Sequence, residues 1–370
     1  MRNDQREQNQ TMTGFDRQSA FAGTKEVAEP LRFDVTRLQS YLQNHIAGFC
    51  GPLGVSQFKG GQSNPTYLLT TPTRRYVLRR KPPGRLLPSA HAVDREFRVI
   101  SALHAQNFPV AAPVLYCADE SIAGTPFYIM SFVAGRVFWN PDMPGSNPAE
   151  RAAVYDAMNA TLACLHGFDP AAIGLADFGR GENYVGRQVG RWSKQYRASE
   201  TQKIDAMENL IAWLPAHLPP PAPVRLVHGD YRLDNLIVSP DVPKICAVLD
   251  WELSTLGDPL ADFTYHLMQW HMPRSDADTG SLVGCDLAGL GLPTRDAYID
   301  AYARRTGLDP RPHLPVYLAY NFFRIAAILQ GIAGRVRDGT ATSEHAPAKA
   351  LLVRPLAETA WAFAREANAR

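Results

Sequence analysis

The fold of this chain is decided by two short stretches, His228-Gly229-Asp230-Tyr231-Arg232-Leu233-Asp234-Asn235 and Leu249-Asp250-Trp251-Glu252. The first follows the apolar run 224–227, and the second begins where the apolar run 245–249 ends. Short apolar runs of this kind are typical of strands. We therefore expect strand-flanked loops that hold the polar side chains of both stretches at one cleft.

Three of these side chains, Asp230, Asn235 and Asp250, suit phosphoryl transfer. That reaction needs a carboxylate to orient the attacking hydroxyl and accept its proton, and it needs ligands for the Mg²⁺ ions that neutralise the phosphates. Mg²⁺ prefers oxygen ligands and keeps several waters, so one or two protein side chains suffice. We predict Asp230 as the catalytic base and Asn235 and Asp250 as Mg²⁺ ligands.

The same residues admit a simpler interpretation. A lone His-Gly-Asp is commonly a turn in which the Asp side chain caps nearby N–H groups. The pattern H-x-D-x-x-x-x-N, followed by an apolar strand that ends in Asp, is instead typical of kinases. The joint pattern therefore favours a kinase-type core over an isolated turn.

The rest of the chain divides into a strand-rich part and a helix-rich part. A first helix is expected at 34–46, where Asp34 can cap, and strands alternate with one helix as far as the junction near 131–135. The expected strands are 55–58, 66–70, 76–79, 114–117 and 127–133, and the helix between them is 90–106. Beyond the junction, helices are expected at 151–166 and 184–199.

These elements predict an α+β fold with two lobes. A small lobe with an antiparallel sheet and one helix, residues 31–133, is expected to bind the nucleotide. A larger and mostly helical lobe, residues 134–370, is expected to carry the catalytic loop and the acceptor site. Residues 1–30 are polar without apolar periodicity, so we predict a disordered or loosely docked arm there.

The catalytic stretches and the order of elements around them resemble the aminoglycoside phosphotransferase and choline kinase-like superfamily, over about residues 35 to 340. The resemblance implies a protein kinase-like two-lobe fold, ATP as phosphoryl donor and Mg²⁺ as cofactor. It implies Asp230 as base, Asn235 and Asp250 as metal ligands, and His228 as an organiser of the loop. His228 can equally be a buried core histidine, and the two roles are compatible.

The strand expected at 76–79 should carry the cation that binds ATP phosphates in kinases. Strand alternation puts Val77 and Arg79 on one side, so Val77 would touch adenine and Arg79 the phosphates. Arginine in place of lysine is a departure from the family pattern, because its fork is larger and bidentate. Glu96 on the next helix is the expected ion-pair partner. Arg80 and Lys81 are adjacent alternatives that we expect to face solvent.

Two further segments are candidates for contacts with the nucleotide. The loop Lys59-Gly60-Gly61-Gln62-Ser63-Asn64 stands where a glycine-rich phosphate loop belongs, with Gly61 and Ser63 as candidate phosphate contacts, although alone it would be only a hairpin turn. Residues 130–133 resemble the hinge that binds adenine through its backbone, with Met130 and Phe132 as the candidate residues. An ordinary core strand is the alternative there.

The acceptor is less well indicated than the reaction. An aminoglycoside is a polycation and should have an acidic site, whereas the helical tail offers several arginines among balanced acids. One of them, Arg324, lies in an apolar helix, and we expect it to be buried and paired with Asp258 or Asp262. The run VLRRKPPGRLLPSAHAVDREFRVISAL is similar to the kinase-like domain fused to, or encoded beside, acyl-CoA dehydrogenases. That resemblance implies a hydroxylated acyl-CoA or another anionic small molecule as acceptor, and a functional link to an acyl-CoA dehydrogenase.

The bulk composition argues against several other classes of function. The 370 residues are 45% apolar and 20% charged, with a net charge of +2 and no run of Lys and Arg, so nucleic-acid binding is not expected. Five scattered cysteines are typical of free thiols in a reducing compartment, and we expect no membrane span and a cytoplasmic protein. Two rival functions remain, a pseudokinase-type module that binds nucleotide without turnover and a two-carboxylate hydrolase using Asp230 and Asp250.

Overall fold

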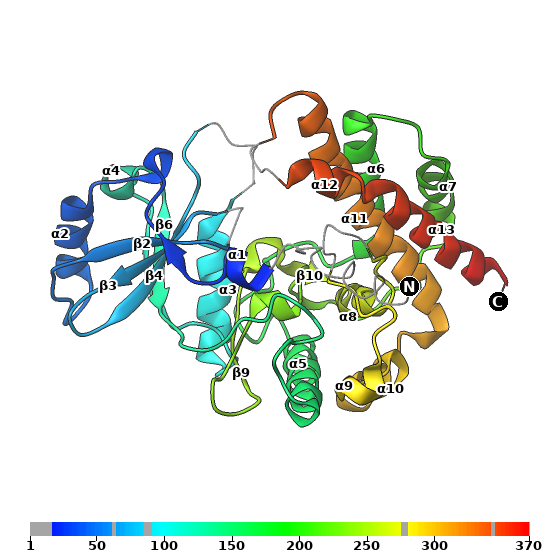
Figure 1. Cartoon of the computed structure of the whole chain (residues 1–370), viewed down its shortest axis with the longest axis horizontal. Helices are drawn as coiled ribbons and strands as arrows, with labels where there is room; N and C mark the ends of the chain where they lie inside the picture. Colours follow the sequence, from blue (N-terminus) through cyan, green and yellow to red (C-terminus); the bar gives the residue numbers. More distant parts are fainter. Residues whose placement is uncertain (1–16, 61–63, 85–90, 275–279, 342–344, 370) are drawn as a thin grey trace, which may run out of the picture.

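The computed structural model describes residues 17–60, 64–84, 91–274, 280–341 and 345–369. It consists of a sheet lobe and a larger, mostly helical lobe, with the N-terminal helix α1 between them (Figure 1). The predicted α+β, protein kinase-like two-lobe fold is confirmed.

The sheet lobe contains six strands, all paired antiparallel, in the order β1-β2-β3-β4-β6-β5. Their bounds are β1 Thr24–Lys25, β2 Gly54–Phe58, β3 Thr66–Thr70, β4 Arg75–Arg80, β5 Pro113–Cys117 and β6 Phe127–Ser131. The two longer helices of this lobe are α2 Val35–His45 and α3 Val93–Ala105, and α4 Glu120–Ala123 adds one turn. Helices α2 and α3 lie close to the predicted ranges 34–46 and 90–106, and α4 was not predicted.

Strand alternation explains why helices α2 and α3 pack against opposite faces of the sheet. On β4, Tyr76 and Leu78 point to the cluster that includes Leu38 and Leu42 of α2. Val77 points the other way, into the cluster that includes α3 and the helical lobe. The face of the sheet on the α3 side therefore lines the cleft, and α2 covers the opposite face.

For residues 17–30 of the predicted arm, the disordered alternative is wrong. Residues 17–30 include helix α1 Arg17–Phe21, strand β1 and the single turn Glu29–Leu31. Strand β1 pairs with the edge strand β2, Thr24 opposite Phe58, so backbone hydrogen bonds order a segment with little apolar content. Residues 1–16 lie outside the described residues.

The helical lobe surrounds two short antiparallel ribbons. One pairs β7 Arg225–Val227 with β10 Thr255–Gly257, and the other pairs β8 Leu236–Val238 with β9 Ile245–Val248. The helices are α5 Pro148–Gly167, α6 Tyr184–Ser199, α7 Asp205–Trp213, α8 Pro259–Leu267, α9 Leu287–Leu290, α10 Arg295–Thr306, α11 Leu314–Arg337, α12 Ala346–Ala350 and α13 Val353–Ala369. Single 3₁₀ turns stand at Leu214–Ala216, Leu233–Asn235, Trp251–Leu253, Met268–Trp270 and Arg311–His313.

One helix bears on the expectation that the chain has no membrane span. The segment Arg311–Arg337 has 27 residues and contains an 18-residue window that is apolar enough by composition to cross a membrane. However, 61% of that window is buried inside the protein, where α11 packs against α13 and α6. A core helix passes the same test, so this is weak evidence for a membrane.

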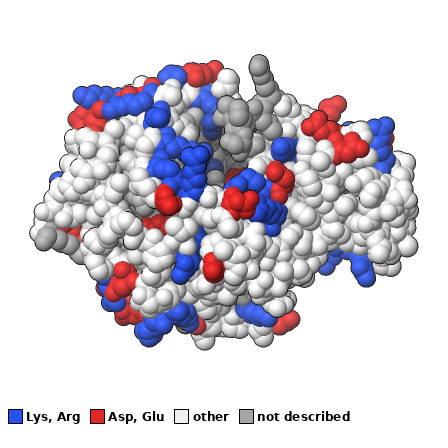
Figure 2. Space-filling view, turned by 180° about the vertical axis from the view of Figure 1, so that it is seen from behind, with Lys and Arg blue, Asp and Glu red and all other residues white. Residues whose placement is uncertain are grey.

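The surface charge agrees with the balanced composition. On the face drawn in Figure 2, small groups of basic and acidic side chains alternate over a mostly uncharged surface. Nucleic-acid binding typically uses a stripe of Lys and Arg on one face, which this face does not show.

Candidate active site

The predicted catalytic loop, residues 228–235, connects β7 to β8 and is held by contacts with helix α8. Both oxygens of the buried Asp262 carboxylate accept backbone hydrogen bonds, from His228 N and Gly229 N, each at 2.8 Å. Burial would raise the pKa of Asp262, but the His166 imidazole and these donors outweigh burial and lower the pKa. Gly229 has φ +83°, and a Cβ there would lie 2.8 Å from the carbonyl oxygen of Leu253, so glycine is required.

His228 joins the two catalytic stretches. Its ring is fully buried, and its Nε2 donates to the carbonyl of Leu249 at 2.8 Å. Its Nδ1 accepts from the backbone N–H of Asp230 at 3.1 Å, which corresponds to the neutral tautomer. Both roles considered for His228, a core histidine and an organiser of the loop, are compatible with these contacts.

Asp230 has a hydrogen-bond donor on each carboxylate oxygen. Tyr265 Oη donates to Oδ1 at 2.5 Å, and Asn235 Nδ2 donates to Oδ2 at 3.1 Å. Burial raises the pKa of Asp230, and the Arg232 guanidinium opposes that shift. A carboxylate held in this way suits a general base.

Asn235 and Asp250 come together because β8 and β9 form a hairpin. Leu236 pairs with Val248, and Leu249 N donates to Asn235 O at 2.8 Å. Asp250 follows the strand in a left-handed conformation with φ 63°. Within the described residues no group of three or more His, Cys, Asp and Glu side chains could hold a metal. Mg²⁺ needs fewer protein ligands than that, and the amide oxygen of Asn235 with the carboxylate of Asp250 suits it.

Arg79 connects the sheet lobe to the catalytic stretches. Its Nη2 donates to Asp250 Oδ1 at 2.6 Å and lies 3.6 Å from Glu252 Oε2. Its Nε lies 2.8 Å from Glu96 Oε2, but the N–H is not aligned for a hydrogen bond, so this contact is an ion pair only. Burial would lower the pKa of Arg79, but Glu96 and Asp250 outweigh burial and raise it.

Glu96 is almost completely buried and also accepts two hydrogen bonds that the sequence did not indicate. Asn64 Nδ2 donates to Oε1 at 2.7 Å, and Tyr128 Oη donates to Oε2 at 3.1 Å. Asn64 belongs to the candidate phosphate loop. The other candidates in that loop, Gly61 and Ser63, lie outside the described residues.

The expectation that Arg80 faces solvent is wrong. Arg80 points to the α2 side of the sheet, where it is only 2% exposed. Its Nη2 donates to the carbonyl of Leu31 at 2.8 Å, its Nε donates to Tyr67 Oη at 3.1 Å, and it also contacts the carbonyl of Ala123. Carbonyl groups satisfy this guanidinium, so strand alternation alone sets Arg79 and Arg80 to different tasks.

Arg324 is buried as expected but does not pair with Asp258 or Asp262. Its Nη2 donates to the carbonyl of Gly229 at 2.8 Å, and its guanidinium lies 5.2 Å from the ring centre of Tyr265. Asp258 instead caps α8 and accepts from Tyr317 Oη at 2.8 Å. The two acids therefore serve the backbone and neighbouring side chains.

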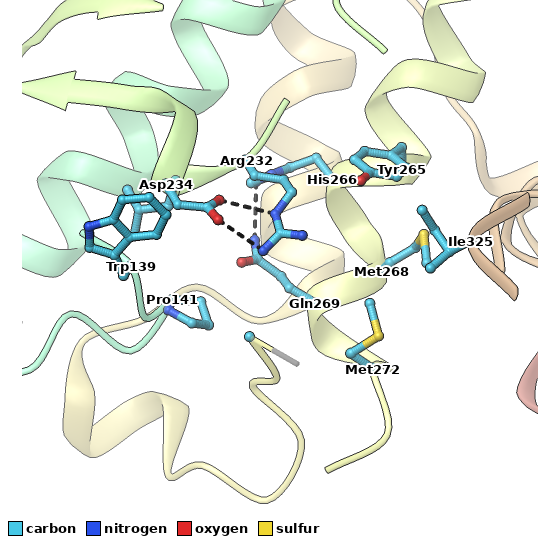
Figure 3. A pocket seen from close by; sticks show the side chains of 12 residues that line it. Trp139, Pro141, Arg232, Asp234, Tyr265, His266, Met268, Gln269, Met272 and Ile325 are labelled. Atoms are coloured by element: carbon cyan, nitrogen blue, oxygen red, sulfur yellow. Dashed lines mark hydrogen bonds and ion pairs between the residues drawn. The ribbon is translucent and has the colours of Figure 1, made fainter. Parts of the chain in front are cut away.

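A cavity of about 960 Å³ lies between the lobes, with Arg79 in its lining. Its lining includes Val77, Met130 and Phe132 from the sheet side, and Asp230, Asn235 and Asp250 from the helical side. A smaller pocket of about 60 Å³ shares Trp139, Arg232 and Asp234 with it. Figure 3 shows this pocket, with Trp139 on one side and Met268, Met272 and Ile325 on the other.

Comparisons with known proteins identify the family of this chain. The model of the Phosphotransferase enzyme family matches residues 54–320. A crystal structure of a Ralstonia eutropha protein assigned to the aminoglycoside phosphotransferases is 48% identical, with a TM-score of 0.82, and the match covers 90% of this chain and 99% of that one. Choline kinase from Cryptosporidium parvum, at 13% identity and a TM-score of 0.55, covering 91% of this chain and 96% of its own, shares the fold.

The curated relatives are longer proteins. Acyl-CoA dehydrogenase family member 10 from Mus musculus is 43% identical over 98% of this chain but only 34% of its own length. Acyl-CoA dehydrogenase family member 11 from Homo sapiens is 41% identical over 91% of this chain and 44% of its own length. The chain thus spans less than half of these relatives, and it belongs to the Phosphotransferase enzyme family.

Proposed function

We propose that this protein transfers the γ-phosphate of ATP to a hydroxyl group of a small molecule in an Mg²⁺-dependent reaction. The observation that carries the proposal is the convergence of Asp230, Asn235 and Asp250 on one cavity, with Arg79 across from them. Phosphoryl transfer depends on positioning and charge stabilisation, and these four side chains offer both.

Each residue has a role that its contacts support. Asp230 accepts the proton of the attacking hydroxyl. Asn235 fixes the orientation of the Asp230 carboxylate through its hydrogen bond to Oδ2. Asn235 Oδ1 and the Asp250 carboxylate would hold Mg²⁺, which neutralises phosphate charge when bound. When ATP binds, Arg79 releases Asp250 and contacts the phosphates, while its ion pair with Glu96 is kept.

The adenine would lie against the face of the sheet that lines the cavity. Val77 and Met130 are cross-strand neighbours there, and both line the cavity. Phe132 N–H makes a long bond of 3.4 Å to the carbonyl of Arg75, so the backbone beyond it, at Val133, is the better candidate for hydrogen bonds to adenine.

The acceptor we propose is a hydroxylated acyl-CoA. The small pocket beside Asp230 has apolar side chains, Met268, Met272 and Ile325, that suit an acyl chain. Its charged lining residues in the described part of the chain are Arg232 and Asp234, which pair with each other at 3.0 Å. An aminoglycoside would call for unpaired acids, and the names of the curated relatives point to acyl-CoA metabolism. A functional link to an acyl-CoA dehydrogenase, in the cytoplasm, is part of this proposal.

A screen of hydroxyl acceptors with ADP release as the readout tests the proposal. Hydroxyacyl-CoAs should support turnover that requires Mg²⁺ and disappears in Asp230→Ala, whereas choline-like alcohols and aminoglycosides should not. ATP binding without turnover of any acceptor would favour a pseudokinase-type module. Activity without nucleotide would favour the two-carboxylate hydrolase.

A further inference from the structure

We propose that Tyr265 is a positioning residue for phosphoryl transfer, which orients the Asp230 carboxylate and keeps it ready to accept a proton. The inference rests on the proposed function, because it assigns Tyr265 a task in the same site. Neither catalytic stretch contains Tyr265, which lies 35 residues beyond Asp230 on helix α8.

Tyr265 and Asn235 each donate a hydrogen bond to one oxygen of the Asp230 carboxylate. The Tyr265 hydroxyl donates to Asp230 Oδ1 at 2.5 Å, while Asn235 Nδ2 donates to Oδ2 at 3.1 Å. Each carboxylate oxygen has two lone pairs, so each keeps one for an acceptor hydroxyl. Two donors from different elements fix the plane of the carboxylate, which a single donor would leave free to rotate.

The position of Tyr265 is fixed by its helix and by a contact with its ring. Helix α8 is fixed beneath the loop by Asp262, whose carboxylate binds the backbone of His228 and Gly229. The Arg324 guanidinium lies 5.2 Å from the Tyr265 ring centre and donates to the carbonyl of Gly229. The same cation therefore contacts both the loop and the tyrosine that reaches the base.

The position of Tyr265 beside the acceptor pocket strengthens the inference. Tyr265 lines the small pocket together with Arg232 (Figure 3). Asp230 lines the larger cavity, which shares Arg232 and Asp234 with that pocket. A hydroxyl entering from the small pocket would reach the base next to the tyrosine. Tyr265 is only 7% exposed, so water competes little for its bond to Asp230.

The Tyr265 phenol remains a hydrogen-bond donor in this setting. Burial, with the Asp230 charge beside it, raises the pKa of Tyr265, so the phenol keeps its proton.

The kinetic test is Tyr265→Phe in the full chain, assayed with MgATP and the acceptor that the screen identifies. A hydrogen bond to a charged group is worth enough that kcat should fall roughly tenfold or more. The KM for the acceptor should change less than kcat, because the lost bond orients the base and does not bind the acceptor. The KM for ATP should stay within about twofold, since Tyr265 faces the acceptor side.

The matched control is Tyr317→Phe. It removes another buried tyrosine bond to a carboxylate, from Tyr317 Oη to Asp258 Oδ2 at 2.8 Å, away from the base. It should lower the melting temperature while kcat stays within about twofold. An unchanged kcat in Tyr265→Phe, with Asp230→Ala inactive, overturns the inference but leaves the proposed function intact.

A second measurement separates the base from stability. The melting temperatures of Tyr265→Phe and Tyr317→Phe should fall by similar amounts, since each loses one tyrosine bond to a carboxylate. A loss of kcat confined to Tyr265→Phe then reflects the orientation of the base. If Tyr317→Phe loses kcat equally, the inference is wrong.

Discussion

Replacing Arg79 separates its two proposed tasks, the balance of buried charge and the binding of ATP phosphates. The Arg79 side chain is 9% exposed and its partner Glu96 only 1%, so Arg79→Met leaves a buried carboxylate without its cation. Breaking a buried pair from one side costs about 3–5 kcal/mol. Two hydrogen bonds remain on Glu96, and burial already raises its pKa, so it can take up a proton. We therefore expect the lower end, about 3 kcal/mol.

Arg79→Lys should have an intermediate effect. The ammonium keeps the charge but cannot reproduce the fork that contacts Glu96 and Asp250 together. Loss of one charge-assisted contact corresponds to about 1.5–3 kcal/mol. The double variant Arg79→Met/Glu96→Gln removes both charges and should recover much of the stability lost in Arg79→Met.

Urea unfolding measures the stability of these variants, and titration calorimetry with MgATP measures their affinity. ATP should bind about tenfold to a hundredfold more weakly to Arg79→Met and to the double variant, because neither has the cation. Recovery of ATP affinity in the double variant would refute a phosphate contact by Arg79. Unchanged stability in Arg79→Met would refute the buried ion pair.

Three further predictions concern the metal site, the pH range and the junction between the lobes. Asp250→Asn should lose at least about a hundredfold in kcat and require more Mg²⁺, and chelation of Mg²⁺ should abolish turnover of the unmodified protein, both measured by ADP release. Burial lowers the pKa of His266 to about 4, so the unfolded chain binds a proton that the folded protein excludes. Stability should therefore fall between pH 6.5 and 4 by about 1.4 kcal/mol per unit, with a shallower slope in His266→Gln when urea midpoints are compared. Gly135→Ala puts a Cβ 2.5 Å from the carbonyl oxygen of Val238, which should cost about 1–3 kcal/mol in the same assay.

The sequence indicated most of the secondary structure, because local signals are strong in this chain. Asp34 caps α2 by accepting from Arg37 N, as its place before an apolar period suggested. Helix α6 has the predicted bounds, Tyr184–Ser199, and β3 lies where alternation placed it, at Thr66–Thr70. Strand β1 had no comparable signal, since a two-residue edge strand depends on its partner β2 rather than on its own residues.

The candidate site was also predicted only in part from the sequence. The spacing of Asp230, Asn235 and Asp250 around two apolar strands predicted their convergence, since a hairpin brings strand ends together. The pairing of Arg79 with Glu96 followed from the order of strand and helix, and the structure contains it. The phosphate contacts of Gly61 and Ser63 stay predictions.

Residue types and their local spacing are enough to identify which residues can do chemistry. Their partners depend on the tertiary structure: Asp250 meets Arg79 across 171 residues, Tyr265 reaches Asp230, and Arg324 binds the Gly229 carbonyl instead of a carboxylate. The physical reason is that strand and helix periods set the face on which a side chain lies but not the element that covers that face. Those contacts depend on how the two lobes and α8 pack around one buried loop.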